Sequence, residues 1–159
     1  MRNLSRCKRA FLVGLAMLCI ASASTSPAAA EDYKTAGGLA VYLGVVPAAM
    51  VKGPPPHSAE QPMHGGVPRH RHDYHVVAAV FDAVTNARVS DATVTAQVSG
   101  LGLSGTTKTL EPMELAKTTT YGNFFNLPGA DLYTIRLTIQ RPGSQRPVVL
   151  DFKYDHRRS

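Results

Sequence analysis

Cysteine is almost missing from this chain, and none occurs after residue 19. Both cysteines, Cys7 and Cys19, lie within the first 30 of the 159 residues. Residues 31–159 therefore can form neither a disulfide nor a thiolate, whether as metal ligand or as nucleophile. A metal site in this part of the chain has to use donors other than thiolate, such as imidazole nitrogen and thioether sulfur.

The sequence also lacks the motifs of the common enzyme classes. It has no P-loop, no dinucleotide-binding fingerprint, no His-Glu zincin motif, and no Ser-His-Asp or Cys-His set that the sequence brings together. Its carboxylates at Asp82, Asp91, Glu111 and Glu114 fall at expected turns or exposed edges, which is typical of a solvated surface. We therefore expect no enzymatic activity.

The first 30 residues have the organisation of a secretory signal peptide. Four basic residues precede the apolar run of residues 10–21, and small residues lead to Ala28-Ala29-Ala30, which resembles a cleavage site. The apolar run is too short to span a membrane. Because Leu18 before Cys19 fits a lipoprotein cleavage site poorly, we favour a soluble exported product cleaved near Ala30, with a lipoprotein as the alternative.

Net charge is low once these residues are set aside. Four of the 17 basic residues lie in the first 30 positions and all 11 acidic residues follow them, so the formal charge falls from +6 to +2. The basic pI of 9.6 is thus largely a property of the signal peptide. This charge balance argues against nucleic-acid binding.

The remaining 129 residues, 31–159, suffice for a single domain, and their pattern is β throughout. Segments rich in Val, Thr and aromatic residues are separated by Gly, Pro and Asn, and no segment has a helical period. Seven short strands at this spacing predict an all-β, Ig-like β-sandwich with Greek-key connections. The predicted strands are residues 38–46, 74–83, 88–99, 106–117, 122–127, 131–140 and 146–154.

One long segment, residues 52–71, interrupts this pattern. It is rich in Pro, His and Gly and has almost no apolar residues, which predicts a loop. Loops of this length in a compact domain are usually functional or disordered. The segment is thus either a ligand-bearing loop or a solvated surface segment.

The loop leads into the apolar segment YHVVAAVF, residues 74–81, in which both alternating sets of side chains are apolar. This pattern predicts a central strand buried on both faces. His75 lies at its entrance. It is either a histidine that hydrogen-bonds to a backbone carbonyl or a metal ligand.

Met113 is the second candidate ligand. Pro112 cannot donate a hydrogen bond to a sheet, so the strand is expected to be an edge or bulged there, with the Met113 side chain turned outward. A methionine is otherwise a common filler of core gaps. An exported site of imidazole and thioether without thiolate suits copper or, less selectively, ferrous iron.

Several segments resemble a known family. LEPMELAKTTTYGNFF (residues 110–125), the preceding DYHVVAAVFD, the opening AVYLGVV and the closing LYTIRLTIQRPG are similar to the copper-containing Ig-like periplasmic proteins that accompany high-affinity iron permeases. The resemblance covers most of residues 36–156. It implies an Ig-like fold, copper binding with iron as the other metal, a role in metal uptake or trafficking with a membrane permease or another metal-handling partner, and a homodimer.

The resemblance also implies a ligand set, which this sequence matches in part. The strand histidine and the methionine of the L-x-P-M segment correspond to His75 and Met113. A glutamate and a second histidine of the family are replaced here by Val77 and Thr120, and a late histidine has no counterpart near residues 142–144.

Other residues are then expected to complete the site. We rank His64 above His70 and His72, because Arg69 and Arg71 alternate with the later two histidines and repel a cation. The candidates that the loop carries before the strand are His57, Met63, His64, His70 and His72. We therefore expect a periplasmic metal-binding accessory protein. The alternative is a metal-free Ig-like module with a structural or protein-interaction role.

Overall fold

The computed structural model describes residues 32–51, 68, 70–102, 104–115, 118–129 and 131–156. The predicted signal peptide and most of the predicted loop at 52–71 lie outside these residues. The described strands are β1 (Tyr33–Ala36), β2 (Leu39–Pro47), β3 (Asp73–Asp82), β4 (Thr93–Ser99), β5 (Thr106–Leu115), β6 (Thr118–Asn126), β7 (Leu132–Gln140) and β8 (Val148–Asp155), and a 3-10 turn, η1 (Ala48–Met50), follows β2. No helix in the described residues is long and apolar enough to cross a membrane.

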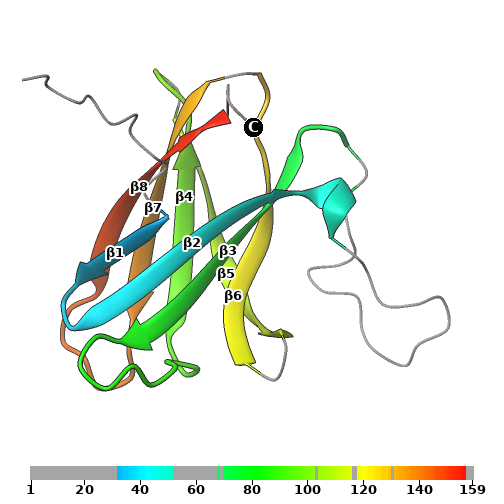
Figure 1. Cartoon of the computed structure of the whole chain (residues 1–159). Coiled ribbons are helices and arrows are strands. Elements are labelled where there is room, and N and C mark those ends of the chain that lie inside the picture. The colour runs from blue at the N-terminus through cyan, green and yellow to red at the C-terminus, as the bar shows by residue number, and fades with distance from the viewer. Residues whose placement is uncertain are drawn as a thin grey trace, which may run out of the picture.

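The strands form one antiparallel sheet in the order β1-β2-β3-β6-β5-β4-β7-β8. β4, β5 and β6 follow one another as a meander, while β7 returns to pair with β4 and β3 pairs with β6, which is a Greek-key arrangement. The sheet curls until β1 lies beside β8 (Figure 1). The prediction of an all-β fold with Greek-key connections is confirmed.

β5 joins the two halves of this curled sheet. Its residues 106–110 pair with β4, and its residues 111–115 pair with β6. In the registers of the described strands, the second half of β5 has a partner on one side only. Pro112 lies in this half, so the expectation of an edge at that position is confirmed.

The core lies inside the curl, and β3 shows which face of the sheet lines it. Val76, Ala78 and Val80 are fully buried, whereas the alternate residues of the strand, Val77, Ala79 and Phe81, are only partly buried. The prediction that β3 is buried on both faces is therefore wrong. Its second apolar set lies on the outer face of the sheet, where these side chains keep part of their surface exposed.

The first strand was not predicted from the sequence. β1 pairs with β2 through a turn at Gly37 and Gly38, which have φ angles of 55° and 77°. Two residues with positive φ suit a type I′ hairpin turn, for which glycine pairs are favoured. The described fold therefore has eight strands where seven were predicted.

A second difference concerns the start of β4, which begins at Thr93 and not near Arg88. The preceding segment crosses between the sheet halves and is held by Tyr121 of β6. The buried Tyr121 hydroxyl accepts a hydrogen bond from the Ala92 N–H and donates one to the Val89 carbonyl, both at 3.1 Å. Burial raises the pKa of this phenol. Tyr121 thereby fixes β6, whose opposite face carries the candidate site.

Candidate metal centre

The candidate site lies on the outer face of three adjacent strands, β3, β6 and β5. Gly122 of β6 pairs with Val77 of β3 on one side and with Glu111 of β5 on the other. His75 stands opposite Phe124, two residues along β6. Because side chains alternate along a strand, all of these positions face away from the core.

His75 and Met113 converge on Gly122 from opposite sides. A Cβ atom built on Gly122 would lie 2.6 Å from His75 Nε2 and 3.1 Å from Met113 Sδ. Any side chain at this position would therefore displace the imidazole, the thioether or both. The missing Cβ leaves a small cradle between a ring nitrogen and a sulfur atom, the two donors named from the sequence.

The His75 ring is held in place by packing. Its residue is 5% exposed, and the ring lies against the Phe124 ring with centroids 4.7 Å apart and planes inclined by 35°. An imidazole fixed in this way loses little further freedom when it binds an ion. The Met113 side chain is partly exposed, so the cradle is open toward solvent on the β5 side.

The two positions at which the resemblance expects further ligands also lie around Gly122. Thr120 stands opposite Met113 and is buried, and its hydroxyl donates to the Met113 carbonyl at 3.4 Å. Val77 lies in the row of Gly122, and its Cγ1 would be 3.0 Å from a Cβ on Gly44 of β2. A hydroxyl directed at the backbone and a valine methyl offer no strong metal ligand here.

The loop candidates are only partly within the described residues. His64 and Met63 lie outside them. His72 is in the turn before β3, where its Nε2 accepts a hydrogen bond from Arg71 Nε at 2.9 Å. No cluster of three or more His, Cys, Asp or Glu suited to a metal occurs in the part of the chain that is described.

The close approach of two side chains at Gly122 and the position of Glu111 beside it were not predicted from the sequence. The residues YGN belong to a segment that resembles the family, but this resemblance does not indicate that the glycine permits a close approach of two side chains. Glu111 was read as a solvated carboxylate, although the spacing E-x-M in a strand places it on the same face as Met113. That spacing was a usable signal.

A further histidine, His156, has a structural role. Its Nδ1 lies 2.5 Å from the Gly129 carbonyl, and its Nε2 lies 2.6 Å from the Tyr74 hydroxyl. Because a carbonyl can only accept, Nδ1 carries the proton, and Nε2 shares a hydrogen bond with the Tyr74 hydroxyl. Both ring nitrogens are therefore engaged, and His156 closes the end of the sandwich rather than offering a ligand.

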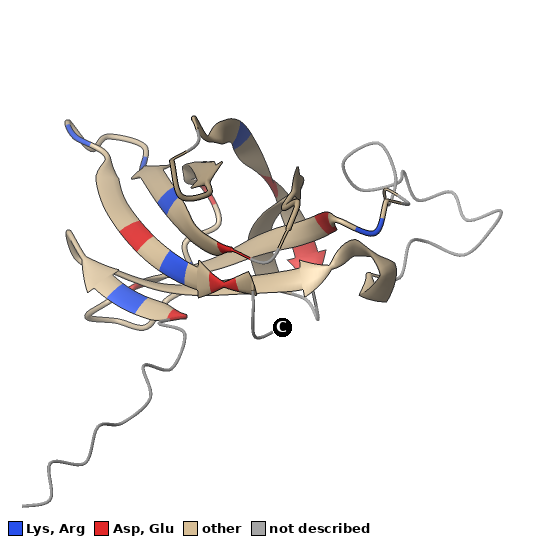
Figure 2. Cartoon of the chain, turned by 90° about the horizontal axis from the view of Figure 1, so that it is seen from above, with Lys and Arg blue, Asp and Glu red and all other residues tan. Residues whose placement is uncertain are grey.

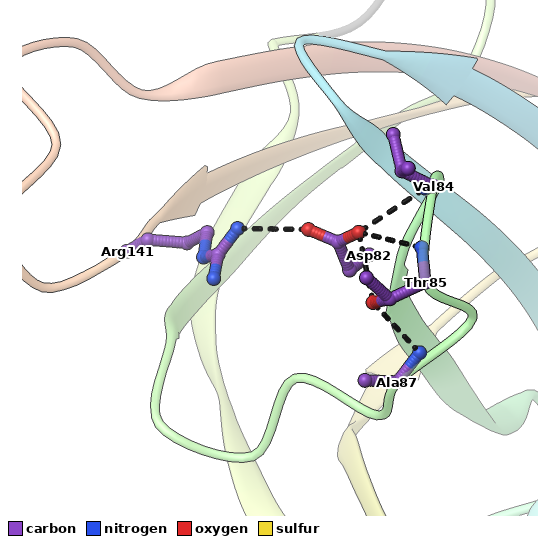
Figure 3. Close-up of polar contacts among 5 residues, drawn as sticks. All are labelled: Asp82, Val84, Thr85, Ala87 and Arg141. Carbon is purple, nitrogen blue, oxygen red and sulfur yellow. Dashed lines mark hydrogen bonds and ion pairs between the residues drawn. The ribbon is translucent and has the colours of Figure 1, made fainter.

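The opposite end of β3 carries a separate polar turn (Figure 3). The Asp82 carboxylate accepts hydrogen bonds from the Val84 and Thr85 N–H groups and the Thr85 hydroxyl, and it faces Arg141 at 3.5 Å. The bonds from Thr85 are the main reason why the pKa of Asp82 is lowered. A hollow beside this turn is lined by Asp82, Arg88, Asp91 and Arg141, and it belongs to a different end of the sheet from the candidate site.

The chain is similar to known proteins in its three-dimensional structure, whereas comparison of its sequence finds no match. No family model and no curated protein sequence matches the chain. Copper-bound variants of two solved proteins match its fold: FetP of uropathogenic Escherichia coli (TM-score 0.58, 15% identity, 77% of this chain and 92% of that one) and P19 of Campylobacter jejuni (TM-score 0.59, 15% identity, 79% and 94%).

The chain has the fold of FetP and P19. A DUF4426 family protein of Pseudomonas aeruginosa matches equally well, with a TM-score of 0.58, 16% identity and coverage of 77% of this chain and 91% of that one. The resemblance noted in the sequence is thus confirmed at the level of the fold. At such low identity, the site and the function have to be argued from the residues of this chain.

Proposed function

We propose that this protein is a periplasmic copper-binding accessory that supports metal uptake or trafficking together with a membrane partner. One observation carries the proposal: His75 Nε2 and Met113 Sδ approach the same point above Gly122 from two different strands. Two solved proteins with this fold are described as copper-bound, which supports the choice of metal.

The donor chemistry favours copper over iron. Thioether sulfur is a soft ligand that selects Cu(I), and imidazole binds several first-row metals, copper and iron among them. Both donors lie on one face, and residues 31–159 contain no thiolate to hold a competing soft-metal site. Ferrous iron would use the imidazole and gain little from the sulfur, so we assign it the lower affinity.

Two ligands alone make a weak site, and the loop is our proposed source of others. We propose that His64 contributes first, with Met63 and His72 as further candidates from the same segment. For His72 to bind through Nε2, that nitrogen would have to give up the hydrogen bond from Arg71. A cation near this pair also meets the positive charge of the guanidinium, which supports ranking His72 last.

Location and partners follow from the sequence. The signal-peptide features of residues 1–30 support export to the periplasm, and the family resemblance supports a permease or other metal-handling partner and a homodimer. Charges of both signs are interspersed along the strands in the view of Figure 2. This mixed surface supports a role without nucleic acid.

The test is metal binding by the mature chain. Protein exported to the periplasm and purified without added metal would be analysed for metal by mass, then titrated with Cu(II), with Cu(I) under reductant, and with Fe(II). We expect one copper per chain with an affinity above that for Fe(II). A chain that binds none of the three would contradict the proposal.

The alternative is a metal-free Ig-like module. It is favoured by the packing of His75 on Phe124, which could serve stability alone, and by the absence of a three-residue cluster of His, Cys, Asp or Glu in the described residues. Replacement of His75 separates the two readings. A structural histidine would change unfolding in the absence of metal, and a ligand would change copper affinity.

A further inference from the structure

We propose that Glu111 is a third ligand, an oxygen donor on β5 that lets the His75–Met113 site hold Cu(II) as well as Cu(I). This inference rests on the proposed copper-binding function. From the sequence alone, this residue is expected to be a solvated carboxylate.

The register places Glu111 at the cradle. Glu111 pairs directly with Gly122, and directly paired residues of antiparallel strands have their Cβ positions roughly 5 Å apart on the same face. Leu110, the preceding residue, is buried in the core, so strand alternation directs Glu111 to the outer face. Since Gly122 has no side chain, nothing of that residue stands between Glu111 and the cradle.

The other positions around Gly122 leave Glu111 as the source of negative charge. Val77 fills the row on the β3 side, Phe124 and Thr120 flank Gly122 along β6, and the Thr120 hydroxyl donates to a backbone carbonyl. Among these described neighbours of the cradle, Glu111 alone carries a carboxylate. A cation held by His75 and Met113 would therefore have one anionic group within reach, and that group comes from the same strand as the methionine.

The chemistry assigns a distinct task to each donor. Cu(II) prefers nitrogen and oxygen ligands in a tetragonal arrangement, whereas thioether sulfur selects Cu(I). His75 would serve both states, Met113 mainly Cu(I), and Glu111 mainly Cu(II). The three residues together then form a site that keeps its copper when the oxidation state changes.

The experiment compares Glu111→Gln with Glu114→Gln in the mature chain. Glutamine keeps the size of the side chain and removes its charge, and Glu111 is exposed, so folding should be preserved. Glu114 is an exposed glutamate of the same strand, paired with Thr119, and it points away from the cradle by strand alternation. Cu(II) and Cu(I) affinities would be measured by competition with chelators of known affinity, with thermal unfolding as the check on folding.

We expect Glu111→Gln to weaken Cu(II) at least tenfold and Cu(I) less than twofold, while Glu114→Gln matches the parent for both. A tenfold loss confined to Cu(II) raises the reduction potential of the bound copper by about 59 mV, which voltammetry can check independently. Equal Cu(II) affinities for Glu111→Gln and the parent would overturn the assignment. It would also be overturned if His64→Ala, measured in the same way, lost Cu(II) affinity while Glu111→Gln did not. If the parent itself binds no copper, the proposed function fails. This result differs from the two results that overturn only the assignment of Glu111.

Discussion

His75 on β3 and Met113 on β5 are separated by a whole strand, yet both side chains reach the same point above Gly122 on the strand between them. The built Cβ of Gly122 would be 2.6 Å from the ring nitrogen and 3.1 Å from the sulfur. Two donors meet here because the intervening residue has no side chain. The following predictions depend on that relationship or on the scaffold that maintains it.

Gly122→Ala should damage the site more than it damages the fold. The new methyl group would push the His75 ring from its place against Phe124, so we expect a loss of roughly 1–3 kcal/mol in the free energy of unfolding and at least a tenfold loss in copper affinity. Gly44→Ala is the matched control. Its Cβ would lie 3.0 Å from Val77 Cγ1 and 4.0 Å from the Val77 carbonyl oxygen, and it would meet neither His75 nor Met113, so copper affinity should stay at the parent value. Similar copper losses in both variants would contradict the role of Gly122.

Met113→Leu should separate stability from binding. Leucine keeps the volume and the apolar character, so unfolding free energy should change by less than about 1.5 kcal/mol, while affinity for Cu(I) falls. Urea unfolding and a Cu(I) competition titration measure the two effects. A stable variant with unchanged Cu(I) affinity would remove the thioether from the site.

Tyr121→Phe should weaken the scaffold without touching the site. The variant leaves the Ala92 N–H and the Val89 carbonyl without the hydroxyl that they share, which costs about 1–3 kcal/mol for buried groups. Copper affinity should not change, because Tyr121 faces the core and the site lies on the other face of β6. A parent-like unfolding curve would show that the crossing segment is held by other contacts.

Low pH should destabilise the fold in part through the turn at Asp82. Its pKa is lowered in the fold, mainly by the hydrogen bonds from Thr85, so the stabilisation is fully present above the ordinary value of 3.8 and is lost as pH falls through the lowered value. In Asp82→Asn this part of the acid dependence should be missing. Unfolding curves of parent and variant between pH 5 and pH 2 check it, and parallel pH profiles would contradict the contribution.

Much of the fold was predictable because its signals are local. Alternating apolar residues and turn residues gave the β class, and Pro112 indicated an edge at the point where β5 passes from β4 to β6. The short strand at Tyr33 was missed although Gly37-Gly38 marks its hairpin. The partial exposure of Val77 was also missed, since an apolar run does not show which face of the sheet another element covers.

For the candidate site, the sequence indicated two residues that the structure brings together, and their role as ligands stays a proposal. His75 and Met113 followed from the donor chemistry, the Pro112 edge and the family resemblance, but their meeting point depends on the register of three strands that are distant in sequence. The positions of Gly122 and Glu111 beside these two residues emerge only from that register. The part played by His64 and Met63 stays a prediction.

The chain should fold without metal. Its core, from Leu39 to Phe152, is built from apolar side chains inside the curled sheet and does not depend on the outer face. Chelation should therefore lower the melting temperature only by the linkage contribution of a bound ion. Loss of cooperative unfolding in chelator would show that the metal is part of the folding core.

The most direct measurement is copper binding by the double variant His75→Ala, Met113→Leu beside the parent, with unfolding curves to confirm that both are folded. We predict one copper per chain for the parent and a loss of at least a hundredfold in Cu(I) affinity for the double variant, because imidazole and thioether are both removed. A folded double variant that binds one copper as tightly as the parent would contradict the site and leave binding to residues elsewhere in the chain.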